Sequence, residues 1–407
     1  MGVVSHVPVA EATRPSRPPG PPPAPTPPAR RRRARRWVVA GVVIAAVAPV
    51  AWSYGRALTG PGNDAWSIRS TEWLKDHHFA WAVNDVERWW YTHHQPRKGG
   101  TPTGALRRAL PATGPAAAPR ATPTTAAGPA HLPPPPAITP FVATPLPGEG
   151  TWRPLGQPVA GLPAMEVAFL RPDAVHTSLL TAVAWIDPDL VRLAGYAGVL
   201  EPGGPWAQQA PIPAFARPAL LAAFNSGFKM RDARGGYYAG GRYARPLVAG
   251  AATLVITTDG KPELGAWGRD VSMGPDVAWA RQNLVLIVDG GAPVAGLESN
   301  NAEWGATLGN RVLVWRSGVG ITADGALVYA AGNGLSAASL ADVLARAGAV
   351  RAMELDINSA WVDFFSYTPP TLVQPLGVTK LLPDMHPSTS NYLTASSRDF
   401  VAVFRRF

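Results

Sequence analysis

Residues 314–361 read VWRSGVGITADGALVYAAGNGLSAASLADVLARAGAVRAMELDINSAW, and this stretch shows how the C-terminal part of the chain is built. Residues 311–322 and 326–332 are short runs rich in apolar and β-branched residues, which is typical of strands. Residues 350–355 form a third apolar run. It passes directly into a dense polar group that consists of Asp356, Asn358 and Ser359.

One helix is predicted between the second and third strands. Apolar residues recur there at i, i+3, i+4 and i+7, which marks one helix face; they are Leu340, Val343, Leu344 and Ala347. Ser336 or Ser339 is the expected N-cap, and Gly348 is the expected stop. Short strands broken by Gly and Pro recur throughout residues 151–407. We therefore predict an α+β domain there, a mixed β-sheet with a few covering helices.

The N-terminal part carries a membrane signal. Residues 1–36 form a Pro/Arg-rich tail with eight arginines and one glutamate, and residues 37–55 follow without a charged side chain. A run of this length is close to the ~20 residues that cross a bilayer. Because the arginines precede it, we expect a single-pass protein of the cell membrane with a cytoplasmic N-terminus and an extracellular main domain. A cleaved signal peptide and a buried helix of a soluble protein are the alternatives.

Two segments connect this span to the domain. Residues 56–96 are aromatic, and Trp73, His77 and Trp81 stand at i, i+4 and i+8 of a predicted helix. Such a helix lies either on the membrane surface or against the domain. Its adjacent histidine pairs point to different helix faces, which is poor ligand spacing for a metal. Residues 97–150 are rich in Pro, Ala and Thr and are predicted to be a linker.

Composition excludes several classes of function. The net charge is +10, but residues 1–36 contribute +7 (eight arginines minus one glutamate), which leaves +3 and no basic face for nucleic acid. The chain has no cysteine, and the domain holds only His176 and His386, so thiol chemistry and a zinc site are not expected. It contains neither a G-x-S-x-G motif nor a P-loop lysine motif. Arginine outnumbers lysine 32 to 5, which suggests a GC-rich bacterial genome.

Four clusters share one form, an apolar strand followed by polar groups at its exit. They are FNSGFKM (224–230), LIVDGGAPV (286–294), VWRSGVGITADG (314–325) and ELDINSAW (354–361). Rigid scaffolds place reactive groups at such strand ends. Taken singly, each cluster is better explained as a turn, a hairpin, a surface charge or an Asx cap than as a functional site. Their joint order and spacing favour a functional interpretation.

That order resembles the phosphodiester glycosidase family, which includes the enzyme that removes N-acetylglucosamine from mannose 6-phosphate tags. The resemblance rests on F-N-x-G-F, then R-S-G-V-G-I-T-x-D-G, then a helix opening S-A-A-S-L-A-D-V-L, and then a strand ending L-D-x-x-S. It covers most of residues 151–407 and implies a domain of that family. Two or three glycines follow the family's aspartate, whereas Ile357 and Asn358 stand here. A β-branched residue adopts φ > 0 only at a cost, so this departure implies a reshaped site or a changed activity.

The resemblance also implies roles for individual residues. The predicted catalytic residues are Asp356, Arg316 and Asn225, and the predicted substrate-binding residues are Ser359, Asn358, Glu354 and Ser226. A guanidinium matches a departing phosphate, and a carboxylate serves the anomeric carbon as base, nucleophile or electrostatic partner. Strand alternation predicts Glu354 and Asp356 on one face; alternatively, Glu354 pairs with Arg351 or Arg311.

A calcium site is a second possibility in the same region. Asp289 and Asp324 are the candidate ligands, together with Asp356, because calcium prefers oxygen ligands. A hairpin aspartate is the simpler interpretation of Asp289, and no other cofactor is predicted. The sequence thus predicts a membrane-anchored hydrolase of sugar-1-phosphodiesters in cell-envelope glycans. The alternatives are an inactive glycan-binding domain of the same fold and a membrane-tethered scaffold.

Overall fold

The structure, a computed structural model, describes residues 20, 29–110, 129–298, 304, 313–371 and 374–406. The chain divides into two units, Met1–Arg56 and Ala57–Phe407. Most of the predicted tail, the middle of the predicted linker and Arg311 lie outside the described residues.

The N-terminal helix α1 (Ala29–Thr59) contains the apolar span. The segment Arg35–Thr59 of this helix is 25 residues long and contains an 18-residue window with a mean hydropathy of 1.9, none of which is buried. At 1.5 Å per residue it is about 37 Å long, enough by length and composition to cross the ~30 Å core of a bilayer. Three further helices precede the domain: α2 (Trp66–Asp76), α3 (Ala80–His93) and α4 (Gly104–Ala109).

Among the described residues, the largest sheet has eight strands in the order β1-β2-β3-β14-β13-β15-β11-β12, and its neighbouring strands run antiparallel. Its strands are β1 (Arg153–Pro154), β2 (Met165–Leu170), β3 (Thr181–Ile186), β11 (Leu286–Asp289), β12 (Ala292–Pro293), β13 (Val314–Thr322), β14 (Leu327–Leu335) and β15 (Ala349–Glu354).

Two five-stranded antiparallel sheets complete the described domain. One has the order β7-β6-β10-β8-β9, with β6 (Tyr237–Ala239), β7 (Arg242–Arg245), β8 (Ala252–Thr257), β9 (Pro262–Ala266) and β10 (Val277–Gln282). The other has the order β17-β16-β5-β18-β4, with β4 (Val191–Tyr196), β5 (Leu220–Asn225), β16 (Phe364–Thr368), β17 (Gly377–Lys380) and β18 (Phe400–Arg405). Two 3-10 helices are η1 (Ala214–Ala219) and η4 (Asn391–Leu393). All three sheets contribute side chains to one continuous hydrophobic core. The described domain consists of β-sheets with a few helices, which confirms the predicted α+β class.

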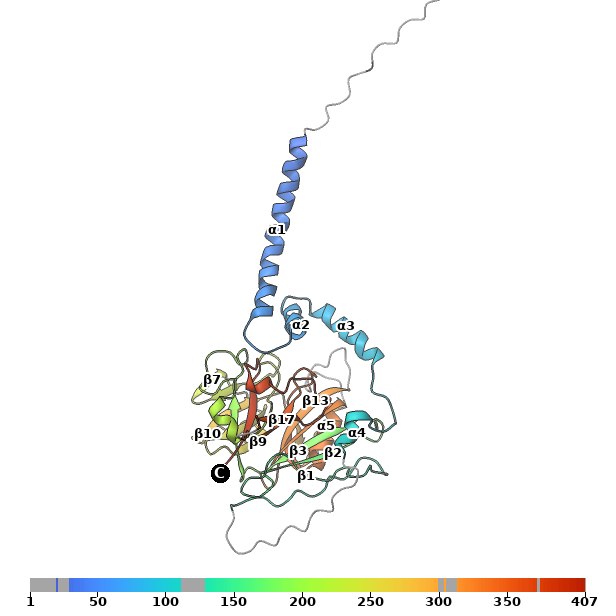
Figure 1. Ribbon diagram of the computed structural model, residues 1–407, viewed down its shortest axis with the longest axis vertical. Helices are drawn as coiled ribbons and strands as arrows, with labels where there is room; N and C mark the ends of the chain where they lie inside the picture. Colours follow the sequence, from blue (N-terminus) through green and yellow to red (C-terminus); the bar gives the residue numbers. More distant parts are fainter. Residues whose placement is uncertain are drawn as a thin grey trace, which may run out of the picture. The chain divides into compact units, whose positions relative to one another are not determined.

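Helix α5 (Ala337–Arg346) covers one face of the eight-stranded sheet, beside β13 (Figure 1). Both predicted caps take part in its first turn: Ser336 accepts from the Ser339 backbone N–H, and Ser339 accepts from the Ser336 backbone N–H, each at 2.9 Å. The helix packs directly on the sheet because Gly318 has no side chain. A Cβ there would come within 3.0 Å of a Leu344 methyl group and 2.9 Å of the Met353 carbonyl oxygen.

Part of the predicted linker packs on the domain. Ile138 is 2 % exposed, and its backbone N–H donates to the Gly150 carbonyl at 2.9 Å. The carboxylate of Glu149 forms a buried ion pair with Arg171, with 2.8 Å between Oε2 and Nη2. These apolar and ionic contacts give residues 129–150 a fixed path that their composition does not indicate. The domain boundaries themselves stay predictions.

Candidate functional site

Ser317 in β13 joins two of the predicted site residues. The Asn225 side chain, at the end of β5, donates from Nδ2 to Ser317 Oγ at 3.0 Å. The backbone N–H of Asp356 approaches the same hydroxyl at 3.3 Å, and the Ser317 N–H donates to the Asp356 carbonyl at 2.9 Å. Residues 225, 317 and 356 are far apart in the sequence, yet they meet at one end of β13. The structure therefore brings Asn225 and Asp356 together.

Asp356 closes the turn that follows β15. Its Oδ1 accepts from the backbone N–H groups of Ile357 at 2.8 Å and Asn358 at 3.0 Å. Asn358 Oδ1 accepts in turn from the Ala360 N–H at 2.9 Å. Neither Ile357 nor Asn358 has a positive φ. The turn is held by side-chain acceptors and not by left-handed backbone, so the expected cost of replacing the family's glycines does not arise.

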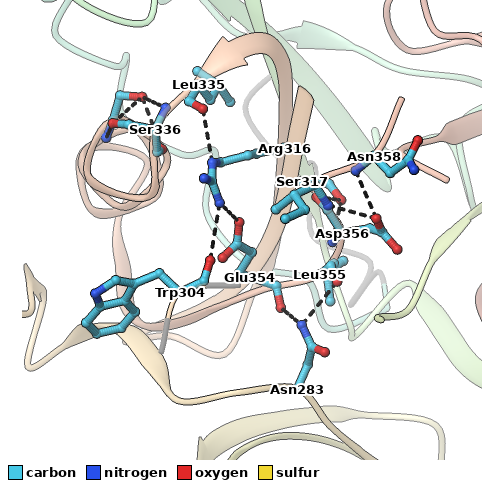
Figure 2. Close-up of polar contacts among 12 residues, drawn as sticks. Asn283, Trp304, Arg316, Ser317, Leu335, Ser336, Glu354, Leu355, Asp356 and Asn358 are labelled. Atoms are coloured by element: carbon cyan, nitrogen blue, oxygen red, sulfur yellow. Dashed lines mark hydrogen bonds and ion pairs between the residues drawn. The ribbon is translucent and has the colours of Figure 1, made fainter. Parts of the chain in front are cut away.

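Arg316 lies on the opposite face of β13 from Ser317, because alternate side chains of a strand point to opposite sides. It is 2 % exposed and forms an ion pair with Glu354, which is 0 % exposed. Its guanidinium also donates to the carbonyl of Leu335 at 3.0 Å. Figure 2 shows this pair beside the start of α5, with the Asp356 carboxyl group directed away from it.

The expected phosphate contact through Arg316 does not fit this placement. A guanidinium buried against a carboxylate on the helix-covered face has no access to a phosphate held near Asp356. Glu354 pairs with Arg316, not with Arg351 as the alternative interpretation had it, and Arg351 instead contacts Asp270 at 3.1 Å. Glu354 and Asp356 also do not share a face as predicted, because the Glu354 carboxylate meets Arg316 and the Asp356 carboxyl group is directed away from that pair (Figure 2).

Two buried carboxyl groups have strongly raised pKa values. Burial raises the pKa of Asp356 to about 6, against the attraction of Arg398. Burial likewise raises the pKa of Asp363 to about 7, although Tyr392 and Asn391 donate hydrogen bonds to its carboxylate. The Asp363 backbone N–H approaches Asn225 Oδ1 at 3.3 Å. Sequence reasoning missed Asp363, and its signal is an aspartate inside the apolar run Trp361 to Phe365.

Arg398 is the second residue that sequence reasoning missed. Its guanidinium lies 4.4 Å from the ring centroid of Trp361, and its Nη1 is buried without a hydrogen-bond partner in the described part of the chain. Its charge is the largest influence that lowers the pKa of Asp356. Lys229, present in the cluster FNSGFKM, lies near it: burial, then the repulsion of Arg398, lowers the pKa of Lys229 to about 8. No local pattern marks Arg398, which stands 42 positions after Asp356.

Of the two predicted serine contacts to substrate, Ser226 lies in an internal network and Ser359 does not. The Ser226 hydroxyl donates to Asp399, and Asp399 forms a fully buried ion pair with Arg281 at 2.7 Å. Ser226 is 1 % exposed, so it supports an internal ion pair. Ser359 is half-buried in the turn after Asn358, and it stays a predicted substrate contact.

The calcium candidates do not gather. Asp289 forms an ion pair with Arg269 at 2.7 Å and lies 4.0 Å from Arg351. Asp324 accepts from the Thr322 hydroxyl in the turn between β13 and β14. Within the described ranges, no group of three or more His, Asp or Glu side chains is arranged to hold a metal.

Residues 220–356 match the family model of the phosphodiester glycosidases. The predicted resemblance is therefore confirmed over β5 to the exit of β15, and the chain carries a domain like that of these hydrolases. The match includes Asn225, Ser317 and Asp356 and ends before Asp363 and Arg398.

Two solved structures are similar to this chain. The catalytic domain of zebrafish N-acetylglucosamine-1-phosphodiester alpha-N-acetylglucosaminidase, auto-inhibited by its pro-peptide, is 17 % identical, and the alignment covers 63 % of this chain and 88 % of that one with a TM-score of 0.40. A hypothetical protein from Synechocystis is 12 % identical, with 62 % and 64 % covered and a TM-score of 0.37. At these values neither likeness contributes to the functional proposal. The comparison with curated proteins gave no match.

The buried pair predicts how substitutions at Arg316 behave. Arg316→Met leaves Glu354 charged and unpaired, so it should lower the free energy of unfolding by about 3–5 kcal/mol. The double variant Arg316→Met with Glu354→Met should recover most of that loss, because it strands no charge. Thermal unfolding of the full chain in detergent measures both. A double variant no more stable than the single one would show that the pair is not the cause.

Proposed function

We propose that this chain is a membrane-anchored, extracytoplasmic hydrolase that cleaves sugar-1-phosphodiester linkages in cell-envelope glycans. The observation that carries the proposal is a buried carboxyl group, Asp356, beside a guanidinium with an unused donor, Arg398, at the end of the family match. Arg398 and Asp356 supply the two kinds of charged group that the reaction needs. A leaving phosphate needs a cation, and the anomeric carbon needs a carboxylate.

Arg398 takes the role that the sequence had suggested for Arg316. A guanidinium offers a planar fork of donors that suits a phosphate diester. Stacking on Trp361 fixes its plane, and the unpartnered Nη1 supplies a donor at no cost of breaking an existing bond. Because phosphate is a good leaving group once its charge is balanced, a strong general acid is less necessary than for an ordinary glycoside.

Asn225 acts as a positioning residue in this proposal. Its Oδ1 accepts from the Tyr329 hydroxyl at 3.0 Å, and its Nδ2 donates to Ser317, which also contacts the Asp356 backbone. With both ends of its amide group engaged and 6 % of the residue exposed, it holds the turn that presents Asp356. Asn358 and Ser359 stay proposed substrate contacts because they are half-buried in that turn.

The proposed topology follows from α1 and its flanks. Arginines before the span favour a cytoplasmic N-terminus, which places residues 57–407 outside. Support for an anchor comes from the 25-residue helical segment Arg35–Thr59, which is long and apolar enough to cross a bilayer. A cleaved signal sequence would release the same domain outside the cell.

Replacing Asp356 tests catalysis against simple binding. Asp356→Asn should lower kcat by about 10²–10⁴-fold, because it removes the charged form that acts at the anomeric carbon. Binding of a non-hydrolysable sugar-1-phosphonate should change little. Release of free sugar is measured on a panel of N-acetylglucosamine, glucose and mannose 1-phosphodiesters, with the exposed Asp324→Asn as control. No release by the folded parent protein would favour the glycan-binding alternative, and no binding would favour the scaffold.

The pH dependence of the reaction follows from the raised pKa of Asp356. The carboxylate forms as pH rises through about 6, so kcat/KM should increase from about pH 5 to about pH 7. Initial rates across this range, on the best ester of the panel, provide the profile. A rate that is flat or that falls over this range would contradict a charged Asp356 in catalysis.

Replacing Arg398 tests its two proposed effects, on the phosphate of the substrate and on the pKa of Asp356. Arg398→Met keeps an apolar chain over Trp361 but removes the phosphate donors, and kcat/KM should fall by about 10²–10³-fold. Arg398 also lowers the pKa of Asp356, so the midpoint of the variant's pH profile should move upward. Arg398→Lys should restore the midpoint of the pH profile more fully than kcat/KM, because lysine returns the positive charge but not the planar set of guanidinium donors. An unmoved midpoint in Arg398→Met would contradict the assigned proximity.

A further inference from the structure

The chain that leaves the apolar helix is bonded onto the proposed site. The Arg69 guanidinium donates to the carbonyl of Gly60 at 2.6 Å and to that of Asp64 at 2.9 Å, which folds residues 57–64 into a tight turn. Asn63 Nδ2 then donates to the Asn391 carbonyl and to Thr394 Oγ1, each at 2.8 Å.

The next residue reaches the proposed phosphate contact. The Ser397 hydroxyl donates to Asp64 Oδ1 at 2.8 Å, and Ser397 directly precedes Arg398. Arg398, in turn, attracts the half-buried Asp64 carboxyl group and lowers its pKa against the larger effect of burial. Three residues separate the end of α1 at Thr59 from Asn63, so the two Cα atoms are at most about 14 Å apart. The Arg398 side of the site is therefore held close to the end of the apolar helix.

Helix α2 strengthens this connection. Glu72 forms an ion pair with Lys229, and Asp76 forms one with Arg231. Lys229 is the residue whose pKa is lowered by burial and by Arg398. The segment after the span thus contacts the domain at two cations close to the proposed site.

The exposed tryptophans of the described residues lie in the N-terminal part of the chain, before the domain. In the regions that the structure describes, every exposed tryptophan lies between residues 37 and 89: Trp37, Trp52, Trp66, Trp81 and Trp89, at 59–77 % exposed. The described tryptophans of residues 151–407 are buried or half-buried. Tryptophan concentrates at the headgroup level of membranes, where its ring is half apolar and its N–H is solvated. Residues 66–93 carry three basic and four acidic residues, so attraction to anionic lipid is not the cause.

We propose that the substrate of this site is itself a membrane lipid: a sugar joined through C1 to a phosphate that is esterified to a long apolar chain. The inference rests on the proposed hydrolase and on α1 as a membrane span. Trp66, Trp81 and Trp89 contact the bilayer surface and set the depth at which Arg398 meets phosphates of the headgroup layer. A hydrolase of wall polymers far from the membrane would have no need for a site held by residues 63 and 64, which directly follow the span.

The reaction consumes one water molecule. The water oxygen forms the new bond to C1, and the bond between C1 and the phosphate oxygen breaks with its electron pair on that oxygen. One water proton passes through the Asp356 carboxylate to solvent. The products are the free sugar and a lipid phosphomonoester that stays in the bilayer.

The test compares two esters of the sugar that is released fastest from the panel above. One ester carries a long polyprenyl chain in phosphatidylcholine vesicles, and the other carries a short, water-soluble butyl chain. With the full chain reconstituted in the same vesicles, kcat/KM should be at least about tenfold higher for the polyprenyl ester. Equal or lower kcat/KM for the polyprenyl ester, with the butyl ester cleaved, would overturn the lipid inference and leave the hydrolase standing. Cleavage of neither ester would remove both.

A substitution set tests the role of the tryptophans. The triple variant Trp66→Ala, Trp81→Ala, Trp89→Ala should lose the preference for the polyprenyl ester while it still cleaves the butyl ester. Phe215→Ala is the matched control, because Phe215 is an aromatic residue 87 % exposed and lies outside this segment. A preference retained by the triple variant would show that these side chains do not set the approach to the bilayer. The comparison of the two esters on the parent protein needs no variant and stands if the triple variant fails to fold.

Discussion

The alternation of side chains along β13 determines which polar residues can share a site. Ser317 points to the core side and meets Asn225 and Asp356, whereas Arg316, one residue earlier, points to α5 and meets Glu354. A shift of one residue in the register of β13 would exchange these partners and bury the wrong polar group on each face. Gly318 has no side chain on the face that α5 covers, so the helix can pack closely on the sheet there. The same strand therefore supplies a structural ion pair on one face and the support of the candidate site on the other.

Burial explains why the candidate site can carry reactive groups. Asp356 and Asp363 are both buried, and burial is the largest cause of the raised pKa of each carboxyl group. Repulsion by Glu354 adds to the effect at Asp356, and repulsion by Asp356 adds to it at Asp363. The hydroxyl of Tyr392 and the amide of Asn391 stabilise the charge of Asp363, and Arg398 stabilises that of Asp356. The two acids thus differ in what surrounds them: Asp363 is enclosed by donors of the fold, and Asp356 keeps one oxygen, Oδ2, that accepts no hydrogen bond from the described residues. That difference separates a structural acid from a candidate catalytic one.

The sequence predicted local features well and long-range partners poorly. The spacing of Leu340, Val343 and Leu344 and the flanking serines located α5, because periodicity and capping are local properties. The role expected for Arg316 came from a motif, and a motif does not contain the partner 38 residues away that neutralises it. Arg398 had no pattern to mark it, since its importance arises only when β18 pairs with β5 beside the Asn225 position. The departure at Ile357 was expected to reshape the site or change the activity because glycine was read as a backbone requirement, whereas side-chain acceptors shape the turn here.

The cations around the proposed site are not equivalent as phosphate contacts. Lys229 and Arg231 are already paired with Glu72 and Asp76, so a phosphate that approached them would have to displace a carboxylate. The exposed pair of Arg231 and Asp76 contributes only about 0–1 kcal/mol to stability. Arg398 differs, because a buried donor without a partner costs about 1–3 kcal/mol while it stays unused. A phosphate oxygen at that position would relieve this cost, which is why Arg398, rather than the paired cations, is the proposed phosphate contact.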